Sequence, residues 1–203
     1  LMVTLLGEAE ANGATLALNT DVVSAKFENG IFAIETLDRD GQEMSLTCAE
    51  LLIAGGLHSQ TLAHNFTGLP DQSIPPQHYA RGCYFTLSGK APFSTLIYPA
   101  PEQAGLGIHL TLDLGGQARF GPDVTWVEEP NYDVPEEKRA GFAAAIRKYY
   151  PSLDENALQT GYAGVRPKIQ APGEAASDFL ISDREAHGID GLVILYGIES
   201  PGL

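Results

Sequence analysis

Apolar positions near the start of the chain follow a helical rhythm and then change to the two-residue rhythm of strands. The first twelve residues place apolar side chains at helical spacing, and Gly13 follows where a left-handed C-cap would end a helix. Asn29-Gly30 is typical of a two-residue hairpin turn. Extended segments surround that turn, at 15–18, 22–28, 31–37 and 43–48. We predict a helix followed by a small antiparallel meander.

Two short apolar runs have no polar alternation. Residues 51–54 form one of them and residues 192–196 the other. The first run breaks into Gly55-Gly56 before a helical segment, and the second ends in Gly197. An unalternating strand is typical of a parallel sheet that is covered on both faces, so we predict an α/β sheet here.

The middle of the chain has a different pattern. Residues 67–76 are rich in Gly, Pro and polar residues, and we place a domain boundary there. Asp133 as N-cap and Pro135 in the first turn predict a long helix that Pro151 ends. Strand-like stretches lie on both sides of it, at 80–87, 95–98, 107–112, 118–120 and 161–168.

We therefore predict a mixed α/β (α+β) fold with two parts. Residues 1–70 and 186–203 would form one domain. Residues 71–185 would form a second domain with a mostly antiparallel sheet and one long helix.

The charge of the chain excludes some classes of partner. Among 203 residues, 12 basic and 26 acidic side chains give a formal charge of −14. Phosphate binding needs a basic face, so we expect no nucleic acid and no anionic membrane surface as partner. No apolar run approaches the roughly 20 residues that span a bilayer. We expect a soluble, cytoplasmic protein.

Cys48 and Cys83 are the only cysteines. They form no CxxC pair and have no metal-like spacing with the five histidines, so we expect no metal site. We favour two thiols in a reducing compartment, with a disulfide between them as the alternative.

Four segments could carry chemistry. The glycines after residues 51–54 would let a backbone approach a ligand, although a simple strand-to-helix turn is the alternative. Arg166 lies between an apolar strand and a proline, where it could bind a carboxylate bidentately or form a structural ion pair. Lys168 would share its strand face.

The other two segments hold a histidine and a loop of small residues. His109 lies in an apolar strand, where it could act as a base or hydrogen-bond partner, or be a satisfied core residue. Residues 197–203 could offer backbone amides to a ligand. They could equally form a strand-to-helix turn with Ser200 as N-cap and Pro201 as the first helical residue, and both interpretations can hold together.

In this order, the four segments resemble the C-terminal part of flavoproteins of the D-amino acid oxidase and glycine oxidase family, in its L-2-hydroxyglutarate dehydrogenase-like branch. The resemblance implies FAD as cofactor, a partial Rossmann-like FAD domain and an antiparallel substrate domain. It also implies a set of cofactor-binding residues: Val22, Ala54, Gly55, Gly56, Gly197, Ile198, Glu199, Ser200, Gly202 and Leu203.

The resemblance further implies oxidation of a small 2-hydroxy acid, similar to 2-hydroxyglutarate, by hydride transfer to FAD. Arg166 would hold the substrate carboxylate, His109 would accept or orient the hydroxyl proton, and Tyr98 or Tyr84 would add a hydrogen bond. Lys168 is a candidate for a second carboxylate, with Arg81 as a weaker one.

Two other functions stay open. The first is amino-acid or sarcosine-type oxidation on the same fold, and the second is a non-catalytic binding module. The sequence does not fix the oligomeric state.

The GxGxxG fingerprint of the family is absent from these residues. We therefore expect the chain to carry only part of the FAD site and, by itself, to bind FAD weakly or not at all. Tight stoichiometric FAD binding by the purified 203-residue chain would refute this expectation.

Overall fold

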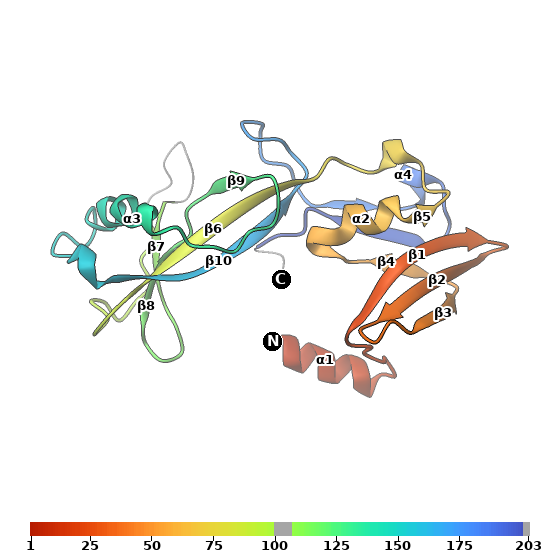
Figure 1. Ribbon diagram of the computed structural model, residues 1–203, viewed down its shortest axis with the longest axis horizontal. Coiled ribbons are helices and arrows are strands. Elements are labelled where there is room, and N and C mark those ends of the chain that lie inside the picture. The colour runs from red at the N-terminus through yellow and green to blue at the C-terminus, as the bar shows by residue number, and fades with distance from the viewer. Residues whose placement is uncertain (100–106, 201–203) are drawn as a thin grey trace. The chain divides into compact units, whose positions relative to one another are not determined.

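The computed structural model describes residues 1–99 and 107–200, which divide into two compact units (Figure 1). Leu1–Ile74 and Ile181–Leu195 form the first unit, and Pro75–Leu180 and Tyr196–Leu203 form the second. The sequence placed the boundaries at 70/71 and 185/186. Among the described residues that follow Leu195, Tyr196–Ser200 group with the second unit.

The first unit begins with helix α1 (Met2–Ala11), which ends ahead of Gly13 at a φ of 91°. A four-stranded sheet follows, in the order β3-β2-β1-β5. Its strands are β1 (Thr20–Glu28), β2 (Ile31–Asp38), β3 (Glu43–Cys48) and β5 (Phe66–Thr67). Asn29 and Gly30 have φ of 53° and 80°, as the predicted hairpin turn requires.

The extended segment predicted at 15–18 was wrong, because these residues join no strand of the described chain. Asn19 has a φ of 56° and turns the backbone before β1 begins. The segment therefore lies outside the ladder that β1 forms with β2.

A second sheet of this unit has the order β11-β12-β4. Its strands are β4 (Leu51–Ile53), β11 (Leu180–Ser182) and β12 (Leu192–Tyr196). β12 pairs in parallel with β4, as an α/β sheet requires. Burial on both faces was wrong for β4, because Leu52 is 60% exposed. A 3₁₀ turn (Gly56–His58) and helix α2 (Ser59–His64) follow β4, and helix α4 (Arg184–His187) precedes β12.

The second unit is built on a five-stranded antiparallel sheet. Its long strands β6 and β10 pair along most of their length, β8 and β7 continue the sheet beyond β6, and β9 also pairs with β6 (Figure 1). The strands are β6 (His78–Leu87), β7 (His109–Leu112), β8 (Ala118–Gly121), β9 (Thr125–Val127) and β10 (Leu158–Lys168). The predicted strand at 95–98 is reduced to one bridge, Ile97 to Leu110.

Helix α3 (Arg139–Ile146) is shorter than the long helix predicted. A 3₁₀ turn (Glu136–Lys138) precedes it, and the N-cap position of that turn is Pro135 rather than Asp133. Asp133 instead donates its backbone N–H to the Oδ1 of Asn131 at 2.8 Å. No helix among the described residues is long and apolar enough to cross a membrane.

The core of the second unit lies between α3 and one face of its sheet. The rings of Phe85 on β6 and Phe142 on α3 are 4.7 Å apart. Phe120 and Leu158 are fully buried beside them. Odd-numbered positions of β6 therefore face α3, since alternate side chains of a strand point to opposite faces.

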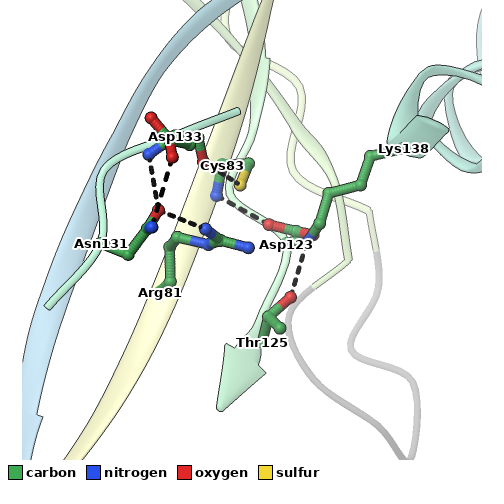
Figure 2. A network of polar contacts seen from close by, with 7 residues as sticks. All are labelled: Arg81, Cys83, Asp123, Thr125, Asn131, Asp133 and Lys138. Atoms are coloured by element: carbon green, nitrogen blue, oxygen red, sulfur yellow. Dashed lines mark hydrogen bonds and ion pairs between the residues drawn. The ribbon is translucent and has the colours of Figure 1, made fainter. Parts of the chain in front are cut away.

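A polar network fastens the segment after β8 to β6 (Figure 2). Asp123 Oδ1 accepts the backbone N–H of Cys83 at 2.7 Å, and Lys138 Nζ binds the other carboxylate oxygen of Asp123. Lys138 also donates to the hydroxyl of Thr125 at 2.5 Å. Cys83 is fully buried, Cys48 is half-buried, and both are free thiols. Burial is the main cause that raises the pKa of Cys83.

We predict that Asp123→Ala lowers the free energy of unfolding of this unit by about 2–3 kcal/mol, because it leaves the amide of Cys83 without its acceptor and the ammonium of Lys138 without its carboxylate partner. Glu155→Ala, which removes an exposed ion pair, should cost less than about 0.5 kcal/mol. Trp126 is the only tryptophan and lies on β9, so its fluorescence during urea unfolding reports this unit. Equal losses for the two variants would contradict the network's role.

Candidate functional site

The register of β6 with β10 decides which side chains share the sheet face that points away from α3. Arg166 pairs with Ala80, and Lys168 pairs with His78. Paired residues of an antiparallel ladder point to the same side. Because even-numbered positions of β6 face away from α3, Arg166 and Lys168 lie together on that open face.

Aromatic side chains form part of the same face. The rings of Tyr84 and Tyr162 stack with centroids 4.5 Å apart and planes 12° apart. The guanidinium of Arg119 lies 5.7 Å from the centre of the Tyr162 ring and pairs with Asp113 at 2.9 Å. The sequence reasoning missed Tyr162 and Arg119, although Tyr162 has the same even parity as Arg166 and Lys168.

Tyr84, Tyr98 and Arg166 lie close enough to influence one another. Burial raises the pKa of Tyr84, and Tyr162 raises it further, while the Arg166 guanidinium lowers it. Tyr98 contributes a further rise. The ring of Tyr98 lies 4.3 Å from that of His109, which is largely buried on β7. The structure thus brings together four side chains that the sequence singled out separately.

Glu199 completes the site. Its Oε1 accepts a hydrogen bond from Lys168 Nζ, and its Oε2 lies 3.5 Å from Arg166 Nη1. The side chains of Lys168 and Glu199 are 16% and 14% exposed, whereas that of Arg166 is 36% exposed. Arg166 therefore does form the ion pair that was the alternative to carboxylate binding, with Glu199 as its partner. Lys168 pairs with the same carboxylate, so the two cations share one negative charge.

Arg81 does not join this site. It pairs in register with Val165, which puts it on the face opposite to Arg166. Its Nη1 donates to Asn131 Oδ1 at 2.7 Å, in the network of Figure 2. The suggestion that Arg81 binds a second carboxylate beside Arg166 was wrong. Arg166 pairs with Ala80, and Arg81, the next residue of β6, points to the opposite face.

The loop after β12 is described only in part. Gly197 has a φ of 66°, Ile198 is half-buried and Ser200 is exposed. Gly202 and Leu203 lie outside the described residues, as does Pro201.

A cavity of about 270 Å³ lies in the first unit, and three of the expected cofactor residues line it: Val22, Ala54 and Gly55. Its wall is mainly apolar, with Ser24 and Asn65 as polar groups. A side chain at Gly55 would bring a Cβ to 2.8 Å from Leu62, so glycine allows the strand to approach α2. Gly56 has a φ of 57°. Helix α2 spans only six residues and adds little dipole for an anion.

Known proteins resemble the chain along its whole length. A family model described as FAD dependent oxidoreductase (DAO) matches residues 1–203. The mitochondrial L-2-hydroxyglutarate dehydrogenase of Arabidopsis thaliana is 43% identical over 219 residues, which cover 98% of this chain and 45% of that protein. A glycerol 3-phosphate dehydrogenase of Caloramator mitchellensis is 25% identical over 99% of the chain and 39% of its own length. The chain thus spans half or less of these relatives.

Solved structures show the same fold. L-alpha-glycerophosphate oxidase from Mycoplasma pneumoniae, with FAD bound, has a TM-score of 0.78 at 22% identity over 98% of this chain and 50% of that one. L-proline dehydrogenase from P. horikoshii has a TM-score of 0.69 at 16% identity over 96% of this chain and 48% of that one. These likenesses confirm the predicted mixed α/β class. The Arabidopsis name places that relative in mitochondria, so the cytoplasmic location is not confirmed.

We predict that Arg166→Met raises the pKa of Tyr84, because the variant removes a cation that stabilises the phenolate. Arg81→Met, on the opposite face, should leave the pKa of Tyr84 unchanged. NMR titration of ring-labelled tyrosines, assigned with Tyr84→Phe, measures both effects. An equal pKa change in the two variants would show that the two arginines do not lie on separate faces.

Proposed function

Since the chain belongs to the family of FAD-dependent oxidoreductases, we propose that it forms the substrate face of an enzyme that oxidises a small 2-hydroxy acid, similar to 2-hydroxyglutarate. The 43% identity to a plant L-2-hydroxyglutarate dehydrogenase supports this substrate class. We also propose the cytoplasm as its compartment.

The observation that carries the proposal is the open face of the second unit. Arg166, Lys168 and Glu199 form a cluster with one net positive charge, and Tyr84 lies close enough for the guanidinium to lower its pKa. A guanidinium that is 36% exposed keeps donors for a carboxylate, which it can bind through two parallel hydrogen bonds. An acid with a polar group next to its carboxylate matches this combination.

Each side chain has a distinct role in the proposed reaction. Arg166 binds the substrate carboxylate and fixes the position of the neighbouring carbon. His109 accepts the hydroxyl proton on a ring nitrogen, as an imidazole can when it acts as a general base. Tyr98, whose ring lies against His109, and Tyr84 donate hydrogen bonds that orient the substrate oxygens. FAD, when bound, supplies the acceptor for the hydride.

The cavity of the first unit fits part of such a cofactor. At about 270 Å³ it is smaller than the roughly 300–1,000 Å³ of pockets that enclose a whole ligand. Its apolar wall and its two polar side chains suit a neutral ring system better than a charged group. Val22, Ala54, Gly55 and Gly56 would hold this portion of FAD, and the amides after Gly197 would contact another.

The competing functions separate by substrate. The enzyme should oxidise 2-hydroxy acids with an artificial electron acceptor or with oxygen, and leave amino acids and sarcosine unchanged. Turnover of amines alone would favour the amino-acid oxidase alternative. A complete protein without a flavin absorption band would favour the non-catalytic module.

We predict that Arg166→Ala in the complete enzyme raises KM for the acid substrate by about a hundredfold, because it removes a charge-assisted pair, while flavin content stays unchanged. Arg81→Ala, which removes an arginine from the other face, should leave KM unchanged. Steady-state kinetics and the flavin absorbance of each variant provide the measurements. A normal KM for Arg166→Ala would refute the carboxylate role.

A further inference from the structure

Glu199 meets its two cations in different ways. The Lys168 ammonium donates directly to Oε1, and both side chains are largely buried. Glu199 Oε2 is inaccessible to solvent and accepts no hydrogen bond within the described residues, although Arg166 Nη1 is 3.5 Å away. The Glu199 carboxylate is therefore hydrogen-bonded to Lys168, whereas it interacts with Arg166 through charge alone.

This asymmetry has an electrostatic consequence. A largely buried ammonium without a partner is costly, so Lys168 needs the charge of Glu199. With that pair closed, Arg166 keeps one positive charge for an external anion. Without Lys168, the same carboxylate would turn to Arg166 and compete with that anion.

We propose that Glu199 is a positioning residue that sets the charge of the site: it neutralises Lys168 and so leaves Arg166 as the single cation for one substrate carboxylate. The inference rests on the proposed function for the nature of the ligand. Lys168 then does not touch substrate, and the second carboxylate of a dicarboxylic acid lies outside this cluster. This replaces the expectation that Lys168 binds a second carboxylate.

A double-mutant cycle in the complete holoenzyme tests the inference, because it separates a direct contact from a charge effect. The variants are Lys168→Met, Glu199→Gln and the double substitution, all close in shape to the native side chains. Calorimetric titration with butyrate and with glutarate gives Kd for one and two carboxylates without any turnover. Lys90→Met, an exposed lysine on the same unit, is the matched control for loss of a positive charge.

The three variants should change Kd in different directions. Lys168→Met should weaken binding of both acids about tenfold, because Glu199 then neutralises Arg166. Glu199→Gln should strengthen binding of both, more for glutarate, because it frees a second cation. The double variant should return Kd to within about threefold of the native value. Lys168→Arg, which keeps the pair, and Lys90→Met should change Kd less than twofold.

The contrary results are equally distinct. A double variant as weak as Lys168→Met would show that Lys168 contacts the ligand itself, and would overturn the inference. So would a native holoenzyme that binds neither acid. If the cycle holds but no 2-hydroxy acid is oxidised, the proposed function fails while the role of Glu199 stands.

Discussion

The antiparallel pairing of β6 with β10 determines where Tyr84, Arg166 and Lys168 point. A slip of one residue would turn Arg166 and Lys168 toward α3 and into the core. Glycine allows the close approach on which the pairing depends: a Cβ at Gly161 would lie 2.7 Å from the backbone oxygen of Tyr84. The bulge between Thr160 and Ala163 changes which positions of β10 face α3, from even before it to odd after it, and so turns Arg166 and Lys168 to the open face. Tyr162 lies within this bulge and stacks on Tyr84.

The two faces of this sheet divide stability from chemistry. On one face, Arg81 donates to Asn131, and Cys83 and Lys138 both donate to Asp123, so these groups serve internal contacts. On the other face, Glu199 neutralises only part of the positive charge of Arg166 and Lys168 together, so Arg166 can bind an external anion. A chain with a formal charge of −14 can thus still present a local site for a small anion, because local pairing rather than net charge governs it.

The sequence predicted much of the fold because its signals were local. Asn29-Gly30 marked a hairpin, and the apolar run at 192–196 marked a strand that pairs in parallel with β4. The sequence was misleading for elements whose conformation depends on residues far along the chain. Residues 15–18 look extended but have no neighbouring strand, and Asp133 looks like a cap but pairs with Asn131. For the site, the spacing of two residues was enough to place Arg166 and Lys168 on the same strand face. The pairing of Arg166 with Ala80 and of Lys168 with His78 could not be predicted, because it depends on a distant strand. That pairing puts Arg81 on the opposite face and Tyr84 near Arg166.

The central claim is that Arg166 binds a substrate carboxylate on the open face while Glu199 stays with Lys168. A crystal structure of the complete flavoprotein with a bound, non-oxidisable acid tests it most directly. We expect the acid's carboxylate within hydrogen-bond distance of the Arg166 guanidinium and beside Tyr84, with the Lys168–Glu199 pair intact. A carboxylate bound away from Arg166, or held by Lys168 after Glu199 has moved aside, would contradict the account.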